Sequence, residues 1–600
     1  MANISKIKRD KMIAFLEELK KTHSDDESIR AFNEIENSLI EKRYGLVFEE
    51  HTEEVDERLQ EEIPVLCEDK ERRICKDENL PWNFIIEGDN LQALYLLEKT
   101  HKGKIDCIYI DPPYNTGAKD WKYNNNYVDG NDVYRHSKWL SMMARRLMLA
   151  KGLLNPQTGV LVVAIDDNEL NTLGLLLQEI FPTYKQFCLT VVHNPNGNQG
   201  KNFGVANEFA YFVLPSGDQI LSLENRQSEP DIRPLRDVSG NNNMRTDAKN
   251  CFYPIYVKDK KIIGFGDVCE DSYHPKYANL IRDDGILEIY PIDASGNERK
   301  WVFARKTVES IMSELKVEWN SSRKIFDIIR YKTHFTYKTV WDKKTYNANS
   351  YGSKLVNKIL GEKRFDYPKS LYTIEECIRA VCAHRKKAIV LDFFAGSGTT
   401  QHAVNLLNAE DGGNRQCIMV TNNEVSADEE KRLMQQGYKK GDDEWEKLGI
   451  AKHVTWPRTV CSIEGKDING KPLKGDYITD CGRELKMSDG FKCNVKYFKC
   501  DWIPRRPEDY LLSNALCLHI KEMIELQTGH EVDGVKQMLI LNKDDYNKIV
   551  SDSNAFAKVE TIWLNQNMIL SSDEMEPLKA KGFKYIPREF FGHELREAAE

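Results

Sequence analysis

The sequence has no apolar run long enough to cross a membrane. None of its uninterrupted apolar stretches approaches the ~18 residues that a membrane-spanning helix needs. Its first 21 residues, MANISKIKRDKMIAFLEELKK, mix charged with apolar side chains and lack the apolar block of a secretion signal. We therefore expect a cytoplasmic protein that does not associate with membranes.

Cysteine pairs of the kind that bind zinc are missing as well. The fourteen cysteines include no C-x-x-C pair. The run CNVKYFKC at 493–500 has a spacing unlike that of a structural zinc site. We expect free thiols in a reducing compartment and no metal site.

A complete phosphate-binding loop is also lacking. The stretch GKDINGKP at 465–472 approaches one, but Pro472 stands where a Ser or Thr would bind magnesium. The pair Asn469-Gly470 suits a hairpin turn better. The sequence therefore predicts no ATPase, and we find no set of residues typical of a nuclease.

What is present is a long chain of ordinary globular composition. At 600 residues, with 41% hydrophobic and 30% charged residues, the chain exceeds the ~300 residues that one core supports, so we expect three or four structural units. The net charge is -9, yet residues 300–344 carry eleven Lys and Arg against five Asp and Glu. A local basic surface in an acidic chain is compatible with binding to phosphates.

Strands and helices alternate in two parts of the chain. Residues 81–218 and 336–455 predict buried strands followed by amphipathic helices, the pattern of an α/β doubly wound parallel sheet. Residues 219–335 interrupt this alternation with short aromatic strands and polar loops, so they are predicted to form an inserted domain. Residues 1–80 predict a helical arm, and residues 456–600 a small α/β C-terminal domain.

A glycine turn joins strand to helix in VLDFFAGSGTTQHAV, residues 390–404. Gly396 and Gly398 would let a ligand approach the backbone closely, and the start of the helix offers unpaired N–H groups. The spacing differs from the full dinucleotide fingerprint. The turn by itself predicts a site for a nucleotide-like ligand.

A second strand, in KIDCIYIDPPYNTG (104–117), ends in Asp111, Pro112, Pro113 and Tyr114. These residues offer a carboxylate, a carbonyl without a competing N–H, and an aromatic ring at the edge where doubly wound sheets bind ligands. If the carboxylate and the carbonyl each accept one N–H of an amine on a heteroaromatic ring, the nitrogen becomes nucleophilic toward a methyl group. Tyr114 would stack on a base that has left the duplex.

Together, DPPYNTG and DFFAGSGTT resemble the signature pair of the amino-group DNA methyltransferases, in the order of their β class. Over roughly residues 1–455 the chain is similar to the modification subunits of type III restriction-modification systems. The resemblance implies the S-adenosylmethionine-dependent methyltransferase fold and an inserted target recognition domain. It also implies S-adenosylmethionine as cofactor, double-stranded DNA as substrate, a homodimer, and a helicase-endonuclease restriction subunit as partner.

The resemblance also assigns roles to single residues. Asp111, Pro112, Pro113 and Tyr114 are implied to form the catalytic loop, and Phe393, Ala395, Gly396 and Gly398 the cofactor turn. Lys369 and Ser370, in FDYPKS, match the segment that holds the methionine carboxylate. Asp89, in EGDN, matches an acid near the adenine of the cofactor. Glu424 is the expected partner of the ribose hydroxyls, with Asn423 as the alternative.

The base that is methylated follows from the first residue of the catalytic motif. In the resembling families, Asp in this place goes with N6 of adenine and Ser with N4 of cytosine, so we expect an adenine-N6 methyltransferase. Cytosine-N4 methylation, RNA methylation and a non-catalytic DNA specificity subunit that recruits a nuclease are the alternatives. The target sequence is not predicted.

Overall fold

The computed structural model describes residues 4–23, 25–40, 46, 48–123, 126–197, 202–217, 219–226, 229–480, 482–505 and 515–591. The chain forms two compact units. The first consists of Met1–Ile220, Thr339–Lys474 and Met487–Glu600, and the second of Leu221–Lys338 and Gly475–Lys486. The second unit contains nearly all of the predicted insertion, together with a short segment from later in the chain.

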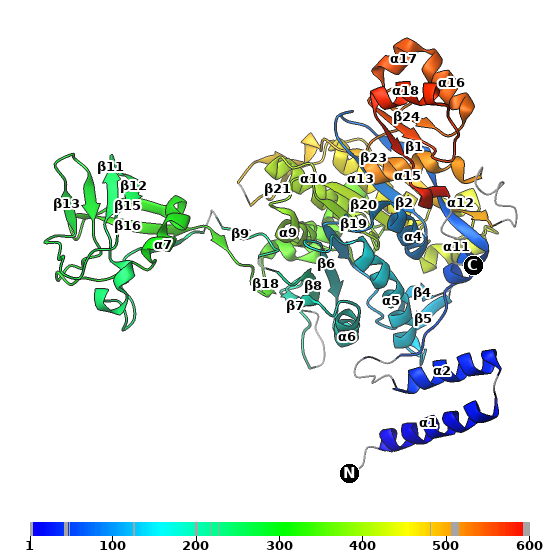
Figure 1. Cartoon of the computed structure of the whole chain (residues 1–600), viewed down its shortest axis with the longest axis horizontal. Coiled ribbons are helices and arrows are strands. Elements are labelled where there is room, and N and C mark those ends of the chain that lie inside the picture. Colours follow the sequence, from blue (N-terminus) through cyan, green and yellow to red (C-terminus); the bar gives the residue numbers. More distant parts are fainter. Residues whose placement is uncertain are drawn as a thin grey trace. The chain divides into compact units, whose positions relative to one another are not determined.

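A ten-stranded sheet forms the centre of the first unit (Figure 1). Its six middle strands, from β23 to β6, are parallel, while β1 and β8 run antiparallel to their neighbours. This confirms the predicted α/β doubly wound fold. The strands in order are β1 (Glu62–Ile74), β23 (Asn494–Pro504), β2 (Trp82–Glu87), β20 (Gln416–Thr421), β19 (Ile389–Asp392), β3 (Cys107–Ile110), β6 (Val160–Ile165), β8 (Glu208–Pro215), β7 (Tyr184–Val191) and β18 (Val340–Trp341).

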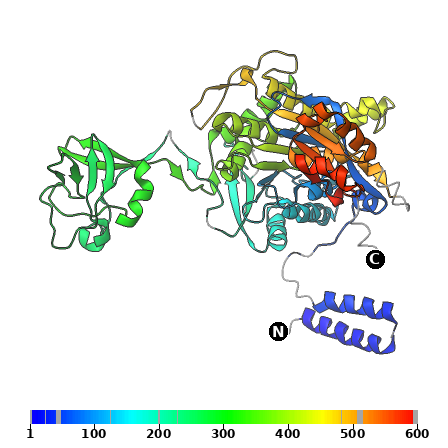
Figure 2. The ribbon, with the colours of Figure 1, turned by 45° about the horizontal axis from the view of Figure 1, so that its top comes forward.

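Helices cover both faces of this sheet (Figures 1 and 2). Ile108 and Ile110 of β3 belong to the core shared with the first group of helices, whereas Cys107 faces Cys382 of the second group. Because both faces are covered, the strands are apolar without alternation, as in VLVVAI of β6. The first group is α4 (Asn90–His101), α5 (Arg135–Leu153), α6 (Leu170–Ile180) and α15 (Ile520–Thr528); the second is α9 (Leu371–Cys382), α10 (Thr399–Asp411) and α13 (Trp456–Glu464).

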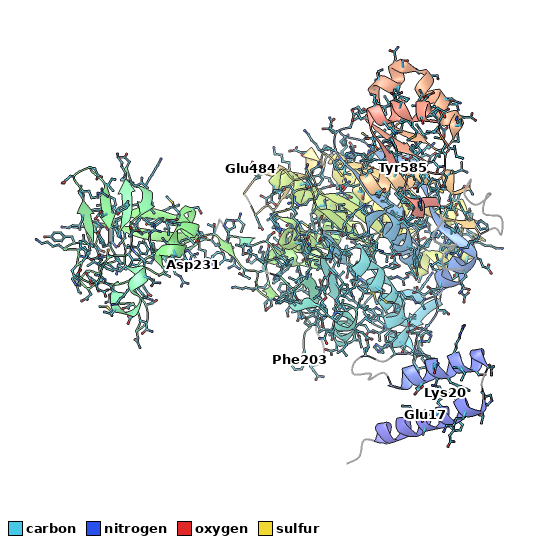
Figure 3. The ribbon with its side chains drawn as sticks, in the orientation of Figure 1. Glu17, Lys20, Phe203, Asp231, Glu484 and Tyr585 are labelled. Carbon is cyan, nitrogen blue, oxygen red and sulfur yellow. The ribbon has the colours of Figure 1, made fainter. Side chains whose placement is uncertain are left out.

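The first 80 residues are only partly the predicted helical arm. Helices α1 (Ile4–Thr22) and α2 (Asp26–Ile40) form a hairpin, on which Figure 3 labels Lys20. Lys20 pairs with Glu36 of α2. After α3 (Glu54–Glu61), however, the chain forms β1, which pairs with β23. A partner strand more than four hundred residues away stabilises β1, and local periodicity cannot reveal such a partner.

Residues 456–600 differ from the predicted separate C-terminal domain, because β23 is inserted in the central sheet and α13 and α15 cover it. Only the last part forms a small α/β unit, with a parallel sheet and its own apolar core. Its elements are β24 (Gln537–Ile540), α16 (Lys543–Ser551), α17 (Ser553–Lys558), β25 (Thr561–Leu564), α18 (Ser572–Lys581) and β26 (Phe583–Tyr585). In the described ranges, no helix is both long and apolar enough to span a membrane.

The second unit is a β-rich body around buried Tyr253, Trp301 and Ile328. A hairpin turn places Asp259 and Lys260 at φ 49° and 59°, as a tight two-residue turn requires. The unit contains a three-stranded sheet of β10 (Asp231–Pro234), β16 (Ile325–Lys332) and β15 (Leu315–Asn320). Its four-stranded sheet consists of β12 (Lys261–Phe265), β11 (Ile255–Lys258), β14 (Leu287–Ile289) and β13 (Asn279–Ile281).

Candidate active site

The two loops singled out by the sequence leave neighbouring strands at the same edge of the sheet. Strands β3 and β19 are parallel and pair directly, with Cys107 opposite Val390 and Ile108 opposite Leu391. Asp111 follows the end of β3, and the glycine turn follows the end of β19 at Asp392. This is the carboxyl edge, where doubly wound sheets bind their ligands.

The loop at Asp111–Tyr114 is anchored on both sides of its prolines. The indole of Trp139, buried in α5, donates a hydrogen bond to the carbonyl of Pro113 (Nε1 to O, 2.7 Å). The hydroxyl of Tyr114 donates to Glu208 at the start of β8 (Oη to Oε2, 3.1 Å). The carboxylate of Asp111 remains 26% exposed. The loop is thus fixed while its acid is accessible.

Lys369 completes this cluster. Its ammonium lies 3.4 Å from Asp111 Oδ1, pairs with Glu208, and also bonds the hydroxyl of Tyr114. Burial raises the pKa of the Asp111 carboxyl; the Lys369 charge opposes this rise and the Glu208 charge adds to it. Burial would lower the pKa of Lys369, but its two carboxylate neighbours outweigh that effect and raise it. Lys369 therefore faces Asp111 as a cation.

The hydroxyl of Ser370, which the resemblance implied to bind a carboxylate together with Lys369, is hydrogen-bonded within the protein. This hydroxyl accepts a hydrogen bond from the backbone N–H of Tyr372 and donates to the carbonyl of Thr345 (2.7 Å). The side chain is buried and caps α9. Because a hydroxyl has one proton to donate, Ser370 has none left for a carboxylate, and of the FDYPKS pair only Lys369 has a charge to offer.

The glycine turn has backbone geometry that other residues adopt at a cost. Gly396 and Gly398 have φ of 46° and 78°, in the left-handed region. A Cβ at Gly396 would lie 3.2 Å from the ring of Phe365. Gly398 occupies the N-cap of α10 without a side-chain cap, so N–H groups of the first turn are not bonded by a cap side chain. Phe393 and Ala395 are buried and shape the turn from within.

Arg458 of α13 supports the turn from behind. The fully buried guanidinium donates to Ser397 Oγ (2.8 Å) and to Thr399 Oγ1 (2.6 Å). The neighbouring Thr455 hydroxyl donates to the carbonyl of Gly396 (2.6 Å). This support was not predicted, because it comes from a segment about sixty residues after the turn, and the residues there match no motif.

Asp392, the last residue of β19, was also missed. It is buried, accepts a hydrogen bond from the N–H of Phe394 (2.9 Å), and bonds the hydroxyl of Thr400. Burial raises its pKa to about 7, and the negative charge of Asp111 contributes to the rise. The charge of Asp111, after β3, therefore acts on the carboxyl of Asp392 at the end of β19.

Two further acids lie at the ends of the next strands. Asp89 follows β2, caps α4 through the N–H of Leu91 (2.7 Å), and has a side chain that is 42% exposed. Glu424 follows β20; burial raises the pKa of its carboxyl, and the charge of Asp89 adds to the rise. The side chain of Asn423 instead bonds Glu446 and the N–H of Lys452. This geometry favours Glu424 over Asn423 as a hydrogen-bond acceptor for a ligand.

These residues fit S-adenosylmethionine. The glycine turn allows close approach of a ligand to the backbone, and the carboxylates of Asp89 and Glu424 can accept hydrogen bonds from hydroxyl or amino groups. Lys369 has a charge suited to a carboxylate and lies beside the catalytic loop; its ammonium contacts Asp111, Glu208 and Tyr114, so a ligand carboxylate would replace one of these contacts. Acceptors at the ends of β2 and β20 and a cation beside β3 bracket the turn after β19.

Comparison with known proteins identifies the family. The family model described as DNA methylase matches residues 105–439, more than half of the chain. The type II methyltransferase M.KpnI of Klebsiella pneumoniae is 31% identical over 352 residues, which cover 56% of this chain and 79% of that protein. The EcoPI Mod subunit, a type III restriction-modification enzyme subunit of Escherichia phage P1, is 28% identical over 406 residues, 60% of each chain. This chain thus spans less than two thirds of that Mod subunit.

Among solved structures, the complex of M1.HpyAVI with SAM is 15% identical, covers 57% of this chain and 93% of that one, and has a TM-score of 0.25. The fold assignment depends on the strand order and not on this overlap. The family match contains both the Asp111 loop and the glycine turn. The chain belongs to the DNA methylase family, and its site has residues that fit S-adenosylmethionine as the methyl donor.

Proposed function

We propose that the protein methylates N6 of adenine in double-stranded DNA at a specific sequence, as the modification subunit of a cytoplasmic type III restriction-modification system. One observation carries the proposal. The acid-proline-proline-tyrosine loop and the glycine turn follow directly paired parallel strands, so that an amine acceptor and a cofactor turn lie side by side.

The catalytic loop has the groups that activate an exocyclic amine. Asp111 Oδ and the carbonyl of Pro112 each accept one N–H, which draws the nitrogen toward tetrahedral geometry and frees its lone pair. Neither Pro112 nor Pro113 has an N–H that would compete for the amine. Tyr114 stacks on the base after the base leaves the duplex. S-adenosylmethionine, when bound, supplies an electrophilic methyl group.

The charged side chains of the site favour release of a proton from the methylated amine. Methylation leaves a positive charge on the amine, and the Asp111 carboxylate is placed to accept the proton that removes this charge. Lys369 opposes the rise in the Asp111 pKa that burial causes, and Glu208 pairs with the Lys369 ammonium. For the cofactor, we assign Gly396 and Gly398 to the backbone approach, Glu424 and Asp89 to its hydroxyl and adenine groups, and Lys369 to its carboxylate.

We assign target recognition to the second unit. Arginines of its basic stretch are paired with acids, such as Arg323 with Asp327 and Arg330 with Glu314, and these pairs fix the geometry of the sheet. Exposed aromatic and basic side chains remain, among them Trp319 and Lys316. Such side chains contact phosphates and bases in DNA-binding proteins.

The proposed assembly is a homodimer that binds a helicase-endonuclease restriction subunit. Its support is the similarity to Mod subunits, whereas M.KpnI is a type II methyltransferase. Co-expression with a candidate restriction subunit and size-exclusion chromatography would separate the two arrangements. Co-elution supports the type III assembly, and a protein that methylates DNA but never co-elutes favours a stand-alone enzyme.

The test of the reaction is analysis of product nucleosides. Duplex DNA is incubated with the protein and S-adenosylmethionine, digested and analysed by mass spectrometry. We expect N6-methyladenine with the wild type, none with Asp111→Ala, and wild-type amounts with Asp167→Ala, which alters an exposed acid after β6. N4-methylcytosine as the product would refute the adenine assignment.

A further inference from the structure

A fully buried carboxylate lies behind the catalytic loop and has no role in the reaction described above. Glu169 stands between β6 and the start of α6, with none of its side chain exposed. Its Oε1 accepts a hydrogen bond from Asn115 Nδ2 (2.6 Å), and its Oε2 bonds the hydroxyl of Thr172. A buried charge is costly unless its lone pairs are satisfied, so these contacts maintain Glu169 as an acceptor.

His136 supplies the third contact, and its proton can be placed. Arg135 Nε donates to His136 Nε2 (3.1 Å), so a neutral imidazole has its proton on Nδ1. That nitrogen lies 2.5 Å from Glu169 Oε1 and donates to it. Glu169 thus joins the loop after β3, the start of α5 and the start of α6.

Asn115 is the link from this carboxylate to the catalytic loop. It follows Tyr114 directly, is fully buried, and has φ of 56°, a left-handed conformation that Asn tolerates better than most residues. Its amide is held at both ends, because Nδ2 donates to Glu169 while Oδ1 accepts from Trp121 Nε1 (3.1 Å). Together with Trp139 on the Pro113 carbonyl, Asn115 fixes the loop on both sides of Tyr114.

We propose that Glu169 is a positioning residue for methyl transfer. Acting through Asn115, it fixes the backbone that places the Pro112 carbonyl and the Tyr114 ring. The inference rests on the proposed function of that loop. Losing the contact should lower the rate of transfer and leave cofactor binding unchanged, because Glu169 contacts the catalytic loop and not the glycine turn.

A swap of donor and acceptor tests the contact. Asn115→Asp places two carboxylates against each other, and Glu169→Gln replaces the charged acceptor by an amide. In the double variant, the amide introduced at position 169 donates to the carboxylate introduced at position 115, which restores this hydrogen bond with reversed polarity, while the bond from His136 Nδ1 to the same atom of residue 169 is lost. We expect the single-turnover rate to fall about 100-fold for N115D, as for a displaced reacting group, and about 10-fold for E169Q. The double variant should transfer methyl groups faster than N115D alone.

Three further measurements separate positioning from folding. The dissociation constant of S-adenosylmethionine, measured by calorimetry, should stay near the wild-type value in each variant, and KM for DNA should change less than kcat. Asp167→Asn, an exposed acid in the same turn, should match the wild type. Should N115D not fold, the test moves to E169Q, where a lower kcat with unchanged KM supports the proposal and an unchanged kcat overturns it.

The outcomes separate the two claims. A double variant that loses as much activity as the two single variants combined refutes the positioning role while the wild type remains an active methyltransferase. If the variants lose methyl transfer activity in proportion to their loss of S-adenosylmethionine binding, the positioning role is also refuted. A wild type that transfers no methyl group to DNA refutes the proposed function and this inference together.

Discussion

The charge of Lys369 should set the lower pH limit of methyl transfer. Its ammonium lies 3.4 Å from Asp111 Oδ1. At that distance the attraction is about 5 kcal/mol for an effective dielectric near 20, and about 1 kcal/mol for that of water. Neighbouring opposite charges of this kind lower a carboxyl pKa by about 1 to 3 units. Lys369→Met removes the charge and keeps the length of the side chain.

The sign of the effect follows from the state of Asp111 that reacts. Burial raises the pKa of Asp111 above its ordinary 3.8, and Lys369 opposes that rise. Transfer needs the carboxylate, because a protonated carboxyl donates a proton where the amine needs an acceptor. The rate therefore falls as the pH drops through this pKa. In K369M the fall should occur about 1 to 3 pH units higher than in the wild type.

Single-turnover transfer, measured from pH 5 to 9 at saturating cofactor, tests this prediction. Glu208→Gln is the matched opposite change, because it removes a negative charge that raises the pKa of Asp111. The rate of this variant should therefore fall at a lower pH than that of the wild type. The double variant K369M/E208Q removes both charges and leaves no unpaired Glu208 to destabilise the fold. If the rate of K369M falls at the same pH as that of the wild type, the Lys369 charge does not act on Asp111 in this way.

Three other predictions concern Asp392, the glycine turn and DNA binding. Asp392 has a pKa of about 7 in the fold against 3.8 for the unfolded chain. Its contribution to stability is therefore fully present below pH 3.8 and is lost as the pH rises through 7. Asp392→Asn should raise the free energy of unfolding, measured by urea titration, by up to about 4 kcal/mol at pH 8 and by little at pH 4. An equal effect at pH 8 and pH 4 would contradict this prediction. Gly398→Ala should weaken binding of S-adenosylmethionine in calorimetry at least tenfold, whereas Gly412→Ala, which has a similar φ of 68° but no neighbour within 4 Å of its Cβ, should not. Affinity for duplex DNA should fall steeply with salt in fluorescence anisotropy, and a flat dependence would exclude phosphate contacts.

Local sequence was enough to predict the sheet and its two loops. Continuous apolar runs such as VLVVAI of β6 belong to strands covered on both faces. The abrupt change from such a strand to Asp111-Pro112-Pro113 marks the edge of the sheet, as does the glycine turn after β19. These signals come from residues adjacent in sequence, and the structure has the strands and loops that they predict.

Contacts between distant segments were not predictable in the same way. Glu208 meets Tyr114 across 94 positions, and Arg458 reaches Ser397 across 61. Strand β1 exists as a strand because β23 pairs with it. Neither an isolated acid at a strand start nor an arginine in a helix has a local pattern that distinguishes it from a surface residue. Asn115 is the exception, since an Asn directly after the catalytic motif could have indicated a left-handed turn.

The most direct test of the central claim is sequencing of modified bases in genomic DNA from cells that express the wild type or Asp111→Ala. We expect N6-methyladenine at one recurring sequence with the wild type and its loss with the variant. Methylation that persists in Asp111→Ala, or that falls on another base, would contradict it.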